Sequence, residues 1–189
     1  MTTHAPEAIE DLTGTYQLDP DHTRLGFVAR HAMVTKVRGS FKDFDGKVTI
    51  DAEDPSQSSV ELQIKTTSLD TGQEQRDAHL RSPDFFDVEN HPEMLFQSTA
   101  VEGNGDKFTV KGDLTIRDVT NPVELDLEYA GSAKDPFGNL RAGFEGGGEI
   151  NRKDWNLEWN AALENGGWLV SDKIKFEFDI SAIKLTPTA

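Results

Sequence analysis

The sequence predicts an all-β protein whose antiparallel strands close into a barrel, with one short helical insertion around residues 71–90. Three observations favour this fold. Apolar and polar residues alternate with a period of two in eight or nine segments, the pattern of a strand with one face toward an apolar interior. Short links rich in Gly, Pro and Asn separate most segments, which is typical of turns between antiparallel neighbours. Only one stretch of the chain has the composition of a helix.

The alternation is weak in the first predicted strands, 25–29 and 48–50, and uninterrupted at 60–65, where the sequence reads VELQIK. Five further strands follow, at 96–100, 108–116, 123–129, 142–150 and 174–180. The predicted turns are Asp45-Gly46, Gly103 to Asp106, Asn121-Pro122, Asp135 to Gly138 and Asn165 to Gly167.

The helical insertion is predicted from good helix formers between Thr71 and Leu80, with Thr71 as a possible N-terminal cap. Ser82-Pro83 is the start of a possible second short helix, because proline suits the first position of a helix. So little helix cannot cover a broad open sheet, and the long strands therefore favour a barrel over two stacked sheets.

Small residues share the inward phase of several strands with Phe, Leu and Ile. Two interpretations stay open at this point. The small residues can leave room for a ligand inside the barrel, or the glycines can permit bulges and sharp coiling in a barrel filled by side chains. The residues concerned are Ser98, Ala100, Gly112, Ala142, Gly146 and Gly148.

Length and composition bound the function. The 189 residues fit one domain, which we place at residues 15–186 behind a flexible tail of residues 1–14. The formal charge of −15 disfavours nucleic acid and anionic membranes as partners, and the sequence shows no concentrated basic patch that would override it. Without cysteine there is no thiol nucleophile. We also expect no signal peptide, no stable membrane insertion and a cytoplasmic location.

The ordered set of motifs resembles the YceI-like family, the polyisoprenoid-binding proteins with a lipocalin-like barrel. The resemblance covers roughly residues 15–185, although Asp118 stands where glycine is usual. The matching stretches are YQLDPDHT at 16–23, VRGSF at 37–41 with FDG at 44–46, RDAHLRSPDFFD at 76–87, HP at 91–92, GDLTIRDVT at 112–120, NRKDW at 151–155 and VSDK at 170–173.

The resemblance implies an eight-stranded antiparallel barrel with an elongated apolar pore for a long-chain isoprenoid, either a prenyl diphosphate or a prenylated quinone. It implies binding, transport or storage without catalysis, and homodimers are common in the family. Two alternatives stay open: an enzyme that acts on a similar amphiphilic lipid inside the barrel, with His79 or His31 as base, and a binder of fatty acids or fatty amides.

We expect the pore to be lined by apolar residues that occupy the inward phase of their strands, although each is also a plausible core residue. These candidates are Phe27, Phe41, Phe96, Phe108, Phe144, Ile150, Phe176 and Phe178.

A polar head group needs partners at the mouth of the barrel. Arg76, Asp77, His79 and Arg81 form the densest ionisable cluster of the chain, and Arg and His donors suit a diphosphate or a quinone carbonyl. In the competing interpretation, Asp77 and Arg81 form a pair within the helix, and His79 holds the helix onto the barrel.

The sequence favours neither catalytic residues nor a metal or other cofactor. The five histidines are dispersed without the spacing of a metal site. The chain has no nucleophile elbow, phosphate loop or dinucleotide fingerprint. Glu124, Asp126 and Glu128 share the polar phase of one strand and fit a solvated outer face.

Overall fold

The structure, a computed structural model, describes residues 12–164, 166–167 and 169–186. Within these residues it contains eleven strands and one α-helix, α1 (Glu74–Arg81). The strands are β1 (Gly14–Leu18), β2 (Arg24–His31), β3 (Thr35–Phe41), β4 (Phe44–Ile50), β5 (Ser59–Lys65), β6 (Leu69–Asp70), β7 (Glu93–Asn104), β8 (Lys107–Ile116), β9 (Val119–Lys134), β10 (Leu140–Asn151) and β11 (Lys173–Lys184). Short 3₁₀ helices are η2 (Pro55–Gln57), η3 (Thr66–Ser68) and η4 (Arg152–Trp155).

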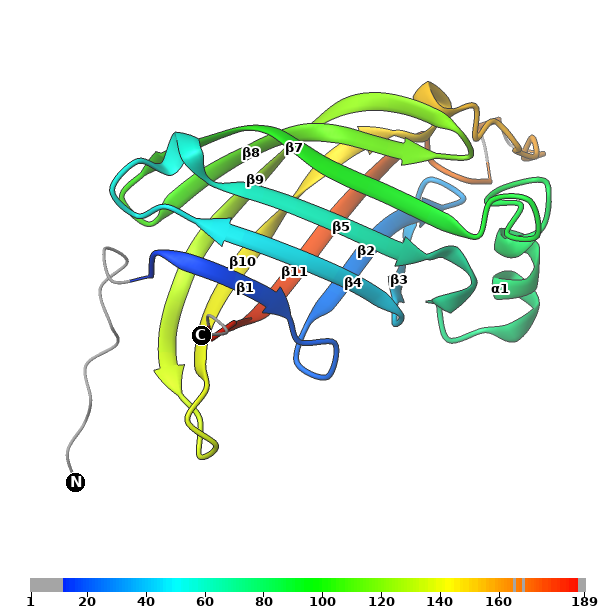
Figure 1. Cartoon of the computed structure of the whole chain (residues 1–189). Helices are drawn as coiled ribbons and strands as arrows, with labels where there is room; N and C mark the ends of the chain where they lie inside the picture. Colours follow the sequence, from blue (N-terminus) through cyan, green and yellow to red (C-terminus); the bar gives the residue numbers. More distant parts are fainter. Residues whose placement is uncertain (1–11, 165, 168, 187–189) are drawn as a thin grey trace.

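Eight of the strands close a ring of antiparallel hydrogen-bonded pairs, in the order β1-β4-β5-β7-β8-β9-β10-β11 and back to β1. The other three extend this ring at one end. There β2 pairs with residues 175–179 of β11, whereas β1 pairs with residues 182–184 of the same strand. Next, β3 pairs with β2, and β6 pairs with β3. The predicted eight-stranded antiparallel barrel with one short helix is confirmed (Figure 1).

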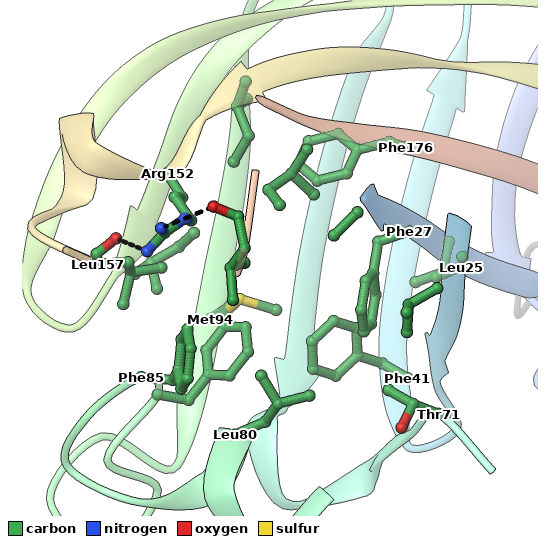
Figure 2. Close-up of a pocket in the computed structure, with 18 of the residues that line it drawn as sticks. Leu25, Phe27, Phe41, Thr71, Leu80, Phe85, Met94, Arg152, Leu157 and Phe176 are labelled. Atoms are coloured by element: carbon green, nitrogen blue, oxygen red, sulfur yellow. Dashed lines mark hydrogen bonds between the residues drawn. The ribbon is translucent and has the colours of Figure 1, made fainter. Parts of the chain in front are cut away.

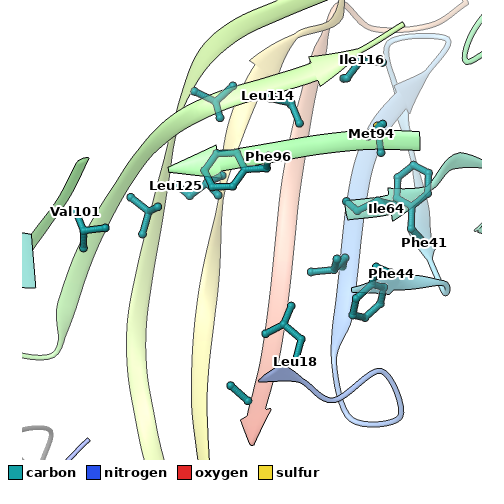
Figure 3. Close-up of a cluster of buried hydrophobic side chains, with 14 of the residues drawn as sticks. Leu18, Phe41, Phe44, Ile64, Met94, Phe96, Val101, Leu114, Ile116 and Leu125 are labelled. Atoms are coloured by element: carbon teal, nitrogen blue, oxygen red, sulfur yellow. The ribbon is translucent and has the colours of Figure 1, made fainter. Parts of the chain in front are cut away.

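Alternation along the strands places apolar side chains inside the barrel. In β8, Val110, Leu114 and Ile116 are buried, and in β9 Val123 and Leu125 are buried between exposed acids. These side chains belong to one continuous core that also includes residues of β1, β4, β5 and β7 (Figure 3). The acidic side chains Glu124, Asp126 and Glu128 are exposed, as the strand phase predicts.

Two of the predicted turns are wrong. Asp45-Gly46 lies inside β4, where the Leu18 side chain occupies the space beside the Gly46 backbone. Asn121-Pro122 lies inside β9 because the chain reverses earlier, between the paired residues Ile116 and Val119. The turns at Gly105 and at Asp135 to Gly138 are present. Of the turn predicted at Asn165 to Gly167, the first residue lies outside the described residues.

Helix α1 begins at Glu74, three residues after the predicted cap. The Thr71 side chain is bonded to Asp77 instead, its hydroxyl donating to Oδ1 at 2.5 Å. The predicted second helix after Ser82 is absent from the structure, which shows turns there. The amide of Phe86 bonds back to the carbonyl of Leu80, and Asp87 adopts a φ of 47°, so the backbone cannot continue as a helix.

At Gly112 and Gly146, the lack of a side chain permits close packing and does not leave empty space. A Cβ on Gly112 would meet the ring of Phe96 at 2.6 Å, so that ring fills the gap left by the glycine. At Gly146, where φ is 153°, a Cβ would lie 1.9 Å from the carbonyl oxygen of Asp126. The register shifts between Ser98 and Ala100 and between Gly143 and Phe144 are the bulges of the second interpretation.

Residues 12–14, which the prediction assigned to the tail, are among the described residues, and Leu12 belongs to the core. Leu12 is fully buried, and its carbonyl accepts a hydrogen bond from the Tyr16 hydroxyl. The rest of the predicted tail, residues 1–11, lies outside the described residues. Across the part of the chain that the structure describes, no helix has the length and hydrophobicity needed to span a bilayer.

Candidate ligand-binding site

A cavity of about 660 Å³ occupies the end of the barrel that carries α1. Its lining at this end comes from the ends of β2 and β3, from helix α1 and from the segment between η4 and β11 (Figure 2). Figure 1 shows where these elements lie in the fold. Ligand pockets for organic molecules have volumes of about 300–1,000 Å³ and mostly apolar linings, so the cavity has the size of a binding site.

Six of the eight predicted pore residues line this cavity: Phe27, Phe41, Phe96, Ile150, Phe176 and Phe178. Their rings form contacting pairs, with centroids 5.5 Å apart for Phe27 and Phe41 and 5.7 Å apart for Phe176 and Phe178. Figure 2 shows Phe27, Phe41 and Phe176 facing the cavity. Their contact with a ligand stays a prediction.

Phe108 and Phe144 do not line this cavity. The two rings meet edge to face with centroids 6.3 Å apart, and Tyr129 packs on Phe144 at 5.7 Å. These residues share the strand phase of the cavity residues but sit at other levels along the barrel. The barrel is therefore hollow at the α1 end and filled by side chains where Phe108 and Phe144 meet.

Several lining residues have no counterpart among the predicted ones. Those from strands follow the same alternation and were within reach of sequence reasoning, whereas those from α1 and the loops carry no periodic signal. The first group includes Leu25, Val37 and Met94, and the second includes Leu80, Phe85, Phe86, Leu157, Trp159 and Leu169.

Arg152 holds the segment that covers one side of the opening. Its guanidinium is buried and donates to the carbonyls of Ser171, Leu157 and Trp159 at 2.9, 2.5 and 2.9 Å. Figure 2 shows the bond to Leu157. Burial lowers the pKa of Arg152, and the nearby Asp172 carboxylate opposes that shift. The sequence contained Arg152 only as part of a family motif, and its organising role was missed.

Trp155 fixes the start of the same segment. It is 2% exposed, and its indole N–H donates to the carbonyl of Leu114 on β8 at 2.9 Å. Together with Arg152 it anchors residues 152–160 to the barrel wall, so Leu157 and Trp159 are held against the cavity.

Two of the four head-group candidates, Arg76 and His79, line the cavity. The half-buried Arg76 side chain donates from Nε to the Thr71 hydroxyl at 2.7 Å and from Nη2 to the Thr71 carbonyl at 2.8 Å. These bonds fix the guanidinium plane at the mouth, next to the polar cavity residues Gln73 and Gln75.

His79 belongs to an aromatic cluster at the mouth. Its ring meets the Trp159 ring edge to face at 4.4 Å and the Phe85 ring at 5.2 Å. Its Nε2 lies 2.9 Å from Oδ2 of Asp84. The histidine therefore bridges α1 to the segment that Arg152 holds, as in the structural interpretation, while one face borders the cavity.

Asp77 and Arg81 do not line the cavity and do not pair with each other in the structure. Asp77 is buried and accepts from the Thr71 amide at 2.9 Å. Arg81 donates to the carbonyls of Thr67 and Leu69 at 3.0 and 2.6 Å. Both side chains tie α1 to the segment before it, so the structure gives them an anchoring position.

The polar lining of the cavity is confined to its opening. Arg30, His31 and Thr35 come from the ends of β2 and β3, and the other polar residues come from α1, the segment before it and η4. Among the described residues, no group of three or more His, Asp or Glu side chains could hold a metal ion. The geometry thus combines a hydrocarbon interior with hydrogen-bond donors at one mouth, which suits an amphiphile.

Comparison with known proteins gives consistent matches. The family model for the YceI-like domain matches residues 16–182. A UPF0312 protein of Photorhabdus laumondii is 45% identical over 149 residues, 78% of each chain, and protein YceI of Escherichia coli O157:H7 is 41% identical over 145 residues, 76% of each chain.

Solved structures show the same fold. The Campylobacter jejuni YceI protein is 28% identical, with a TM-score of 0.71 over 83% of this chain and 90% of that one. A polyisoprenoid binding domain from Saccharophagus degradans is 15% identical, with a TM-score of 0.68 over 90% of this chain and 98% of that one.

Proposed function

The chain belongs to the YceI-like family, and from this premise we propose that it binds a long-chain isoprenoid lipid in its apolar cavity and carries or stores it unchanged. The observation that carries the proposal is the cavity of about 660 Å³ with an apolar interior and polar groups only at its mouth. A polyprenyl chain offers no hydrogen-bonding groups, so its binding rests on apolar area removed from water, at roughly 25 cal/mol per Å². The name of the Saccharophagus degradans domain supports the same ligand class.

In this proposal the prenyl chain lies among Phe27, Phe41 and Phe176, and the head group stays at the mouth beside Arg76. Two nitrogens of Arg76 donate to Thr71, which restrains the guanidinium at the wall of the cavity. A preoriented arginine gives charge-assisted hydrogen bonds to a diphosphate and a weaker hydrogen bond to a quinone carbonyl.

The test is calorimetric titration of the delipidated protein with a short-chain prenylated quinone and with a prenyl diphosphate. Ala29 lines the cavity, so Ala29→Trp should fill part of it and abolish uptake of both ligands. Leu95→Trp on the exposed face of β7 is the matched control and should bind normally. Equal affinity in all three proteins would contradict the proposed site.

Arg76→Gln separates the head-group role from a structural one. A head-group contact predicts at least a tenfold loss of affinity for the prenyl diphosphate, with little change for the corresponding prenyl alcohol. A purely structural role predicts lower stability and equal changes for the two ligands.

An enzyme is the second candidate because the His79 ring nitrogen and the Asp84 carboxylate form a pair at the mouth, 2.9 Å apart, as a general base and its orienting group do. Mass analysis of lipid recovered after prolonged incubation distinguishes the two candidates. Unchanged lipid fits the carrier, and a product that disappears in His79→Gln fits the enzyme.

A further inference from the structure

A basic stretch stands out in this acidic chain and corrects our expectation that no basic patch exists. Residues 23–42 hold five Lys and Arg residues, Arg24, Arg30, Lys36, Arg38 and Lys42, and no Asp or Glu. This stretch forms β2, β3 and the hairpin between them.

The fold gathers four cations on the outer surface of this hairpin and of β11. In the strand register, Val28 stands between Arg38 of β3 and Lys175 of β11, and Arg30 stands opposite Lys36. All four cationic side chains are exposed. We call Arg30, Lys36, Arg38 and Lys175 the cationic face.

The cationic face is poorly neutralised by the protein itself. Among the described residues, its one ion pair joins Arg38 to Glu177 at a long 3.8 Å. Like charges directly opposite each other on neighbouring strands are destabilising, and Arg30 and Lys36 are such a pair. Acidic residues adjoin this face on one side, where Glu149 of β10 stands opposite Lys175, and continue along β11 at Glu177 and Asp179, away from the barrel mouth.

The tip of the hairpin is apolar and exposed. Residues 32–34 form the tip, and the Met33 and Val34 side chains are 59% and 73% exposed. Ala32 and Met33 have φ angles of 51° and 65°, where Gly, Asn or Asp is usual. The hairpin thus exposes two apolar side chains at a turn whose backbone is strained for these residue types. This combination fits a tip that makes apolar contacts with a partner.

This hairpin borders the opening of the cavity. Arg30, His31 and Thr35 line the mouth, and the Ala32 amide donates to the carbonyl of Leu169, another lining residue, at 2.8 Å. In Figure 1 the hairpin between β2 and β3 lies at the same end of the barrel as α1. An apolar tip, a cationic face and the cavity mouth therefore occupy one end of the molecule.

We propose that this end docks reversibly on an anionic phospholipid bilayer, with residues 32–34 entering the interface and the cationic face on the lipid phosphates. The proposal rests on the proposed function, since a lipid with a long prenyl chain must pass between the bilayer and the cavity without crossing water. Charge complementarity selects the occupant, because basic side chains beside an exposed apolar loop bind anionic lipid surfaces. The overall charge of −15 does not prevent this, because salt screens charges beyond about 8 Å.

The test is co-sedimentation of the full chain with vesicles of phosphatidylcholine and phosphatidylglycerol, compared with phosphatidylcholine alone. We expect association with the mixed vesicles only, weakened by added salt. Lys36→Glu should weaken it roughly tenfold. Lys134→Glu makes the same charge change in β9 and should leave association unchanged. A second matched pair tests the apolar tip, since both side chains are exposed. Val34→Ser in the tip should weaken association, and Phe137→Ser, in the turn between β9 and β10, is its control.

Equal loss in Lys36→Glu and Lys134→Glu would overturn the proposal, as would equal binding to neutral vesicles. Absence of co-sedimentation with either kind of vesicle would also contradict the proposal. It would favour an acidic protein as the partner of the cationic face. The Lys36→Glu protein should still bind a short-chain prenylated quinone in solution with wild-type affinity. This readout separates failure of docking from failure of the cavity to bind lipid.

Discussion

At the scale of single residues, Arg152 shows how a buried charge can shape a binding site. Its guanidinium donates to three backbone carbonyls in the segment between η4 and β11, which has no regular secondary structure. The side chain is 3% exposed, and Asp172 lies 3.7 Å away. The arrangement gives the loop over the cavity one defined position, although burying a charge is costly unless it is fully hydrogen-bonded.

Arg152→Met should destabilise the protein by about 3 kcal/mol, because the buried carbonyls lose their donor. Urea denaturation measures this loss. The neighbouring exposed Lys153 pairs with the same Asp172 at 3.4 Å, so Lys153→Met is the control and should cost less than about 1 kcal/mol. Equal losses in the two variants would show that Arg152 does not organise the segment.

Asp19 carries the clearest pH dependence. Burial alone would raise the pKa of Asp19, but hydrogen bonds from Arg141 and His22 and from the backbone amide of Asp21 outweigh it, and the pKa is lowered. A lowered folded-state pKa stabilises the protein fully above the unfolded-state value, about 3.9, and that stability is lost as the pH falls through the folded-state value.

Asp19→Asn should therefore cost about 2 kcal/mol at neutral pH, and the difference from wild type should shrink as the pH falls below about 4. Urea midpoints of both proteins across this range provide the measurement. A difference that stays constant into the acid range would mean that the carboxylate charge is not what Arg141 and His22 stabilise.

The sequence predicted which side chains point into the barrel better than it predicted their position along the barrel axis. Phe108, Phe144 and Phe176 share an inward phase, yet Phe176 lines the cavity and the other two pack on each other or on Tyr129. A period of two indicates which face of a strand is buried, but strand stagger decides the level along the barrel. The partners of Arg76 and Arg81 were beyond prediction for a related reason, since they are backbone carbonyls and one hydroxyl in residues 67–71, ahead of α1.

At the scale of elements, glycine and proline were ambiguous signals. Pro122 sits opposite Asp113 within a long strand, and the hairpin before it turns at Arg117 and Asp118, with φ angles of 50° and 63°. Arg117 is not a typical choice for such a turn, and no glycine, asparagine or proline stands beside Asp118 to mark it. The strands themselves were predictable, because each has one face in the core and one in water.

Asp118→Gly should stabilise the protein by about 0.5 kcal/mol, because glycine adopts positive φ without the steric cost. The carboxylate of Asp118 lies 3.3 Å from Nδ1 of His91 but is 89% exposed, so little is lost with it. Thermal unfolding of the two proteins measures the change. A lower melting temperature in the variant would mean that the contact with His91 outweighs the backbone strain.

At the scale of the whole molecule, the barrel divides into a filled part and a hollow part. Where Phe108, Tyr129 and Phe144 meet, rings occupy the interior, and at the α1 end the cavity of about 660 Å³ stays open. The filled part supplies core packing, and the hollow part leaves apolar surface for a ligand. Stability and binding should therefore respond to different residues.

Phe144→Ala and Phe176→Ala test this division with the same chemical change. Phe144→Ala should cost about 3 kcal/mol of stability and leave ligand affinity intact, because it opens a void in packed surroundings. Phe176→Ala should cost less stability and weaken ligand binding, because one side of its ring already faces the cavity. Denaturation gives the stability of each variant, and titration gives its ligand affinity. If the two variants lost similar stability and similar affinity, the division would be contradicted.

Native mass spectrometry of the protein, purified without detergent and then reloaded with a prenylated quinone, tests the central claim most directly. The account predicts one lipid bound to each wild-type chain and no uptake by Ala29→Trp, whose added indole occupies part of the cavity. A wild-type protein that neither carries a hydrophobic ligand nor takes up the quinone would contradict the account.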